Sequence, residues 1–154
     1  MLIIYLLFSG VIIGLDQLMK FWTVENFFIG QEQSLIPNVF SLTYLQNTGG
    51  AFSLLEGQRI FFIIISIVAV IVVVYFLHKY LKESKWLTIG LSLFLAGAIG
   101  NFIDRFRLGY VVDMFQLDFV RFPIFNIADM ALTIGVALII IYLFLDEREK
   151  KHAS

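Results

Sequence analysis

The sequence has no cysteine and few charged residues. The absence of cysteine excludes disulfides, thiolate catalysis and cysteine-ligated metals. Charged residues make up 15% of the 154 positions, compared with about 25% in soluble domains. Because the formal net charge is −1, no strong basic field points to nucleic acid, and we expect no nucleic-acid partner.

The sequence has instead a large excess of apolar residues. They make up 60% of the chain, compared with about 45–50% in soluble domains. A water-soluble fold of this size has too little interior to bury that much apolar surface. Disordered chains are poor in apolar residues and rich in charge, so disorder is excluded as well. The remaining class is an integral membrane protein.

Four segments are long and apolar enough to cross a bilayer, which takes about 20 mostly apolar residues. They are residues 2–21, 60–77, 86–103 and 127–145. We expect helices, because a span in lipid must satisfy its own backbone hydrogen bonds and these runs lack the alternation of barrel strands. The first segment lacks a basic start and an A-x-A cleavage site, so we expect it to be retained. The predicted fold is an all-α integral membrane protein with four transmembrane helices.

Two connecting segments, residues 22–59 and 104–126, are too long and too apolar to be simple or disordered connectors. The first contains a strand-like stretch at residues 39–46, followed by turn residues at 47–50. We therefore expect a small, partly β platform on the extracytoplasmic side. With the four spans it forms one membrane-embedded domain covering residues 1–154.

Basic residues favour a cytoplasmic location for both termini by a narrow margin. In that orientation six lysines and arginines lie inside and five lie outside or at the boundary. The inside set is Lys79, Lys82, Lys85, Arg148, Lys150 and Lys151; the outside set is Lys20, Arg59, Arg105, Arg107 and Arg121. The loop at 78–85 and the tail at 148–151 support this orientation because both lie close to span ends.

Ionisable residues gather near the predicted external boundary of the membrane, and the cytoplasmic half of the spans has no comparable set. Burial of charge at membrane depth is costly, so such residues suggest a functional site. The set is Asp16, Lys20, Asp104, Arg105, Asp113 and Asp129.

Several of these residues also have structural explanations. Asp16 and Lys20 are spaced i, i+4, and an ion pair between them explains the spacing as well as a direct role does. Asn101, Asp104 and Arg105 share one helix face, which can be read as a polar helix end with the arginine reaching the headgroups.

Two further patterns near helix ends favour structure over chemistry. The small residues of AGAIG at 96–100 allow another helix to approach closely. Asn126 and Asp129 are spaced i, i+3 after Pro123, where a helix should begin, and they resemble a capping box. Capping alone would explain that pair.

Asp113 lies in the apolar stretch VVDMF at 111–115. It is either an exposed loop aspartate or a carboxyl held against the membrane. An apolar setting raises the pKa of a carboxyl, and a second carboxylate nearby raises it further. Two carboxyls that share a proton can act as acid and base on a peptide bond. The spacing leaves open whether Asp113 and Asp129 meet.

Other chemistries lack the residues they need. The two histidines, His78 and His152, are both predicted to be cytoplasmic. A catalytic zinc site usually takes three protein ligands, and a serine triad needs a histidine on the same side. The glycines at 48–52 do not form a phosphate-binding loop. Aspartates remain as candidates, and we expect no metal or other cofactor.

Four stretches of the chain resemble lipoprotein signal peptidase (signal peptidase II), a family of bacterial membrane aspartic proteases. With the four spans, the resemblance covers nearly the whole chain. The block GN-x-x-DR-x-x-x-G-x-VVD followed by FN-x-AD is the most specific part. The stretches are DQLMK (16–20), QNTGGAF (46–52), GNFIDRFRLGYVVDMF (100–115) and FNIADMAL (125–132).

The resemblance implies that Asp113 and Asp129 form the catalytic pair. Asp104 would hold the loop that carries Asp113, and Asp16 and Lys20 would stabilise the fold or the site from the first helix. The implied supporting residues are Asn126, Asn101, Arg105, Asp104, Asp16 and Lys20, and the implied substrate-facing residues are Asn47 and Gly49.

The resemblance also implies a substrate, a location and an inhibitor. The substrate is a prolipoprotein whose cysteine carries a diacylglyceryl group, cleaved just before that cysteine to release the signal peptide. The protein would lie in the bacterial cell membrane, in contact with lipid, with its active site near the outer face. The cyclic peptide globomycin would inhibit it. One aspartate would take a proton from water while the other donates one.

Two functions from other classes stay open on the residues alone. A small proton-coupled transporter or channel subunit also uses buried acids, but it predicts polar residues spread through the membrane thickness. A non-enzymatic assembly factor built on glycine-rich helix packing leaves the acids unexplained.

Overall fold

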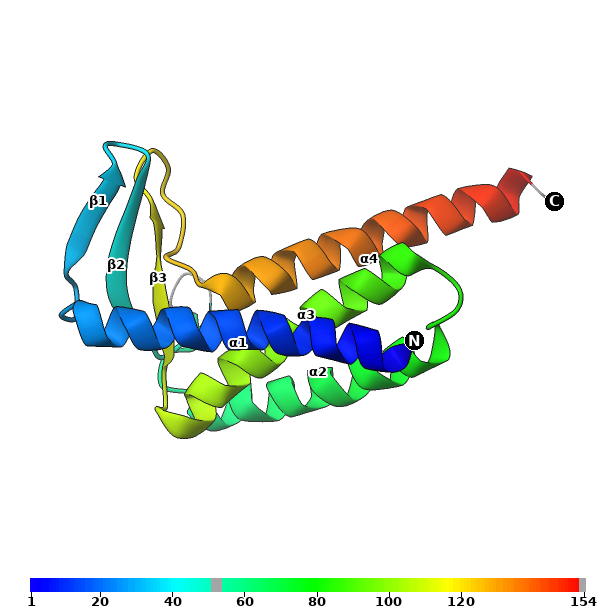
Figure 1. Cartoon of the computed structure of the whole chain (residues 1–154), viewed down its shortest axis with the longest axis horizontal. Helices are drawn as coiled ribbons and strands as arrows, with labels where there is room; N and C mark the ends of the chain where they lie inside the picture. Colours follow the sequence, from blue (N-terminus) through cyan, green and yellow to red (C-terminus); the bar gives the residue numbers. More distant parts are fainter. Residues whose placement is uncertain (51–53, 153–154) are drawn as a thin grey trace.

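The computed structural model describes residues 1–50 and 54–152, and within them it forms a helical bundle with a small sheet at one end (Figure 1). Both termini lie at the end of the bundle away from the sheet. The helices are α1 (Leu2–Asn26), α2 (Arg59–Lys79), α3 (Lys85–Arg107) and α4 (Ile127–His152), and the strands are β1 (Glu32–Ile36), β2 (Phe40–Asn47) and β3 (Val111–Leu117).

The four predicted membrane helices are confirmed, because each observed helix is long and apolar enough to cross a bilayer. Helix α3 is the central one and packs against the other three. In an apolar 18-residue stretch of α3, 67% of the residues are buried, compared with 11% in α1 and α2 and 17% in α4. The exposed apolar side chains of the outer helices therefore face the lipid.

All four helices extend further than the predicted spans, and two of them do so by several residues at the sheet end of the bundle. Helix α1 continues past the expected end at residue 21 to Asn26, and α3 continues past residue 103 to Arg107. In α1, the buried face that carries Asp16 and Lys20 continues to Thr23. Helix α1 therefore extends, on its buried side, beyond its most apolar part.

Helices α3 and α4 approach each other through glycines. A Cβ placed at Gly97 would meet the carbonyl oxygen of Ala128 and lie 2.6 Å from Cγ of Leu132. This confirms the close packing predicted for residues 96–100. A second contact, between Gly90 and Gly135, was not predicted; a Cβ on Gly135 would lie 2.7 Å from the Gly90 carbonyl oxygen.

The three strands form an antiparallel sheet in the order β1-β2-β3, which confirms the partly β platform. Strand β2 matches the strand-like stretch predicted at 39–46. Its register with β3 shifts between Leu42 and Leu45, and Leu45 pairs with Asp113. The sheet buries an apolar cluster of Phe27, Leu42, Tyr44, Val112 and Met114. Strand β3 therefore holds Asp113 in a fixed, buried position.

We expect Gly97→Ala to destabilise the protein by about 1–3 kcal/mol, because the methyl group would push α4 away from α3. Gly10→Ala in α1 is the matched control, since nothing lies within 4 Å of a Cβ at that position. Thermal unfolding in detergent measures both. Equal unfolding midpoints for the two variants would contradict this account of the α3–α4 contact.

Candidate active site

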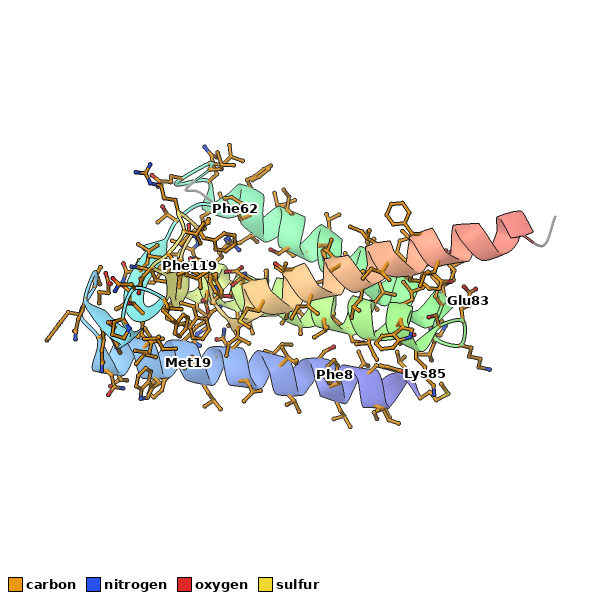
Figure 2. All side chains as sticks on the ribbon, turned by 90° about the horizontal axis from the view of Figure 1, so that it is seen from above. Phe8, Met19, Phe62, Glu83, Lys85 and Phe119 are labelled. Atoms are coloured by element: carbon orange, nitrogen blue, oxygen red, sulfur yellow. The ribbon has the colours of Figure 1, made fainter. Side chains whose placement is uncertain are left out.

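A cavity of about 470 Å³ opens where the sheet meets α3 and α4. Among the described residues, six polar side chains line it: Asn47, Asn101, Arg105, Asp113, Asp129 and Thr133. Most of the remaining wall is apolar and comes from residues 122–125 and the Met130–Ile134 stretch of α4. In Figure 2, Phe62 and Phe119 label this end of the molecule, and Glu83 and Lys85 label the opposite end. The cavity therefore lies at the end of the bundle away from both termini.

Asp113 projects from β3 and is only 1% exposed, so the alternative of an exposed loop aspartate is wrong. Its Oδ1 accepts a hydrogen bond from Nδ2 of Asn126 (2.6 Å), and its Oδ2 accepts one from Nδ2 of Asn47 (2.9 Å). Burial, and secondly the nearby Asp129, raise the pKa of Asp113 to about 7, and the two amides oppose that rise. This carboxyl can hold a proton near neutral pH.

Asp129 lies in the first turn of α4 and takes part in a capping box. Its backbone N–H donates to Oδ1 of Asn126 (2.8 Å), and its Oδ2 accepts from the backbone N–H of Asn126 (3.2 Å). The predicted capping box is thus confirmed. It does not account for the whole carboxyl, because Oδ1 also accepts from Nδ2 of Asn101 (2.7 Å) and the side chain lines the cavity.

One amide connects the two carboxyls. Asn126 donates from Nδ2 to Asp113 and accepts at Oδ1 from the backbone of Asp129. The same Nδ2 lies 3.2 Å from Oδ1 of Asn101. Asn126 is completely buried, so these contacts are shielded from water. The fold brings Asp113 of β3 and Asp129 of α4 to the wall of one cavity.

A buried ionic cluster lies behind this wall. Nζ of Lys20 is 2.9 Å from Oδ2 of Asp16 and 2.9 Å from Oδ2 of Asp104, and all three side chains are at most 3% exposed. The predicted i, i+4 pair of Asp16 and Lys20 is confirmed. Its second partner, Asp104 on α3, was not predicted as one. Lys20 also donates to Oδ1 of Asn101 (3.1 Å).

The two carboxylates of this cluster each hold the backbone beside a cavity aspartate. Oδ1 of Asp16 accepts from the N–H of Ala128 (2.9 Å), the residue before Asp129. Oδ2 of Asp104 accepts from the N–H of Val112 (3.1 Å), the residue before Asp113. The Lys20 ammonium draws both carboxylates together. The spacing of the two cavity aspartates therefore depends on this cluster.

Sequence reasoning gave Gln17 no role, although it lies within the DQLMK stretch. Its Nε2 donates to Oδ1 of Asp104 (2.9 Å) and lies 3.2 Å from the carbonyl oxygen of Gly100. These contacts tie α1 to α3 beside the ionic cluster. The position of Gln17 next to Asp16 in that motif was the available signal.

Arg105 does not reach toward headgroups as one interpretation predicted. Its guanidinium donates to the carbonyl oxygen of Gly49 (3.0 Å), lies 4.6 Å from the ring centroid of Phe62 and lines the cavity. A backbone carbonyl and an aromatic face near the cavity satisfy the cation, so it turns inward. Sequence reasoning also missed Arg59, which donates to the carbonyl oxygens of Arg105 (2.8 Å) and Phe106 (2.7 Å).

Of the two predicted substrate-facing residues, Asn47 lines the cavity, whereas Gly49 is buried behind it and the neighbouring Gly50 lines the cavity instead. Oδ1 of Asn47 accepts from the N–H of Gly49 (2.9 Å), while its Nδ2 holds Asp113. The contact from Arg105 fixes the carbonyl of Gly49. The final residues of the QNTGGAF stretch, 51 and 52, lie outside the described residues.

The chain is similar to known proteins over nearly its whole length. The model of the family described as signal peptidase (SPase) II matches residues 8–145. The chain belongs to the signal peptidase II family. The lipoprotein signal peptidase of Enterococcus faecalis is 54% identical over 154 residues, covering 100% of this chain and 96% of the relative. That of Streptococcus pneumoniae is 50% identical over 136 residues, covering 88% of this chain and 89% of the relative.

The fold of this signal peptidase II chain is similar to that of solved bacterial membrane enzymes. One of them, determined by the in meso method at 2.3 Å resolution, matches with a TM-score of 0.88 and 39% identity over 95% of this chain and 90% of its own. A second, at 1.9 Å resolution, matches with a TM-score of 0.81 and 40% identity over 90% of this chain and 91% of its own. The chain is a membrane peptidase.

We expect Lys20→Met to destabilise this peptidase by about 3–5 kcal/mol, because it leaves Asp16 and Asp104 as two buried carboxylates without a cation. Adding Asp16→Asn should restore part of the loss, since one of the two charges is then removed. Lys82→Met, at an exposed position, is the control. Denaturant unfolding in detergent compares them, and a Lys20→Met protein as stable as the control contradicts the account.

Proposed function

We propose that this chain is an aspartic endopeptidase that removes signal peptides from diacylglyceryl-modified prolipoproteins, cleaving before the lipidated cysteine. Asp113 and Asp129 are its catalytic pair. The observation that carries the proposal is the pair of carboxyls on one apolar cavity wall, linked through Asn126. Two carboxyls in such a setting share one proton, so that one can act as the acid and the other as the base.

The shape of the cavity supports a substrate that already lies in the membrane. Its wall continues from the two aspartates along the Met130–Ile134 stretch of α4, part of a helix apolar enough to span a bilayer. A signal helix lying against this stretch would bring its end to the carboxyls. The similarity of the chain to lipoprotein signal peptidases supports prolipoproteins as the substrate class.

The proposed orientation has both termini in the cytoplasm and the active site near the outer face of the cell membrane. The termini lie at the end of the bundle away from the sheet (Figure 1). Lys85, the first residue of α3 after its short basic connection from α2, lies at that same end (Figure 2). Positive charge in a short connection favours the cytoplasmic side. The sheet and its cavity then face outward.

The surroundings of the two carboxyls support different roles for them. Asp113 is buried, with its pKa raised to about 7, and holds the proton at rest. Asp129 lies at the N-terminus of α4 and accepts from the side chain of Asn101 and the backbone of Asn126, contacts that favour a negative charge. Asp129 is therefore the base and Asp113 the acid.

Hydrolysis then proceeds in two proton-balanced steps. Asp129 takes a proton from a water molecule as the water oxygen bonds to the scissile carbonyl carbon, and Asp113 gives its proton to the carbonyl oxygen. In the second step Asp129 returns its proton to the peptide nitrogen, the carbon–nitrogen bond breaks, and Asp113 recovers a proton from a hydroxyl of the tetrahedral carbon. The residues act as general acid and base and form no covalent bond to the substrate.

We expect Asp113→Asn and Asp129→Asn each to lower the rate of cleavage by at least about 10²-fold, since a positioned acid or base contributes about 10²–10⁴-fold. The assay uses purified protein in detergent with a diacylglyceryl-modified prolipoprotein and a chelator. Asp118→Asn is the control. Asp118 accepts a hydrogen bond from Ser41 on the sheet and does not line the cavity that contains Asp113 and Asp129.

Each contrary result in this assay has a separate meaning. Cleavage at the control rate by either variant removes that aspartate from the pair. Loss of wild-type cleavage on chelation contradicts a mechanism that uses only carboxyls. Proton flux through reconstituted protein without cleavage supports a transporter instead. We also propose that globomycin blocks the wild-type reaction, and resistance to it contradicts that part.

The proton on Asp113 predicts a pH dependence. Activity should fall as the pH rises past about 7, because Asp113 then loses the proton that it must donate. The Asn47 amide stabilises the ionised form and lowers this pKa, so Asn47→Ala should raise it and move the alkaline limb of kcat/KM upward by about 0.5–1 pH unit. A limb that moves downward contradicts the assignment of Asp113 as the acid.

A further inference from the structure

The amide of Asn101 lies between the ionic cluster and the proposed catalytic base. Its Oδ1 accepts from Nζ of Lys20 (3.1 Å) and lies 3.2 Å from Nδ2 of Asn126. Its Nδ2 donates to Oδ1 of Asp129 (2.7 Å). Asn101 is 4% exposed, so water cannot readily replace these partners. The two ends of the amide thus face groups of opposite hydrogen-bonding character.

Lys20 decides which end of the amide faces Asp129. An ammonium group has three donors and no acceptor. Lys20 directs them to Asp16, Asp104 and Asn101, so the atom of Asn101 that faces it has to be the oxygen. The nitrogen is then left to donate to Asp129. A rotated amide would set its NH₂ against the ammonium and its oxygen against the carboxylate.

We propose that Lys20 is a positioning residue that acts on Asp129 through Asn101, by fixing the amide so that it donates to the carboxylate. The inference rests on the proposed function, since it assumes that Asp129 is the base. It gives Lys20 a role beyond the neutralisation of Asp16 and Asp104. Without that orientation, Asp129 loses a short hydrogen bond to its charged form and gains a proton at higher pH.

The competing explanation is a direct effect of the lysine charge. Asp129 is surrounded by charged groups from three other elements. They are Asp16 and Lys20 of α1, Asp104 and Arg105 of α3, and Asp113 of β3. Removal of Lys20 alone changes both the local charge and the donor to Asn101, so the test needs a charge-matched variant.

The double variant Asp16→Asn/Lys20→Met provides that match, because it removes one negative and one positive charge. Asn at position 16 keeps an oxygen for the N–H of Ala128. The proposal predicts that the acid limb of kcat/KM moves upward by about one pH unit. Asn101→Leu should cause a similar shift, and combining it with the double variant should add nothing. An unmoved limb, or shifts that add, would overturn the proposal.

Lys20→Gln tests the same point if the double variant does not fold. Its side-chain NH₂ retains a donor for Oδ1 of Asn101 but carries no charge. The proposal predicts an acid limb closer to wild type than that of Asn101→Leu. A shift as large as that of Asn101→Leu supports the charge explanation and overturns the proposal.

A measurement on the wild-type enzyme reports the amide orientation directly. In protein labelled with ¹⁵N-asparagine, the side-chain signal of Asn101 is the one lost in Asn101→Leu. The proposal predicts that this signal titrates together with the acid limb of activity, because its NH₂ faces Asp129. A signal that does not respond to pH over that range overturns it.

Failure of this inference and failure of the proposed function give different results. If Asp113→Asn or Asp129→Asn cleaves at the wild-type rate, the proposed function fails first. If both are inactive while the Lys20 and Asn101 effects are independent, only the positioning role of Lys20 fails.

Discussion

The arrangement of the site depends on one buried interaction, the contact of the Lys20 ammonium with Asp16 and Asp104. Charges taken out of water carry a large desolvation cost, so a buried ion pair is weak evidence of stabilisation. The role of this cluster is to position the backbone next to the two cavity aspartates. Its carboxylates hold the backbone at Ala128 and Val112, each directly before a cavity aspartate, and so set the α4 N-terminus against β3.

The surrounding fold makes this cluster possible. Helix α3 is the buried centre of the bundle, and its glycine contact lets α4 lie close enough for Asn101 to reach Asp129. At the end of the bundle, the sheet fixes Asp113 through the pairing of β3 with β2. Polar side chains of α1, α3, β3 and α4 thus meet at one layer, while the outer faces of the helices remain apolar.

The sequence predicted the helices and the contacts that follow from local periodicity. It did not predict the contacts that form only when separate elements pack against each other. Long apolar runs specified the four helices, and i, i+3 or i, i+4 spacing specified the capping box of α4 and the Asp16–Lys20 pair. The second partner of Lys20 lies 84 positions away, and Arg105 bonds to a carbonyl 56 positions away. No periodicity encodes such contacts, because they form only when separate elements pack.

The central claim is that the two carboxyls in this largely apolar cavity carry one proton, and that this proton is on Asp113 in the resting enzyme. Infrared difference spectroscopy of the resting enzyme in detergent, at a pH just below 7, tests this most directly. The account predicts the carbonyl stretch of a protonated carboxylic acid in the wild type and its loss in Asp113→Asn. A wild-type spectrum without that band, or a band that persists in the variant, would contradict it.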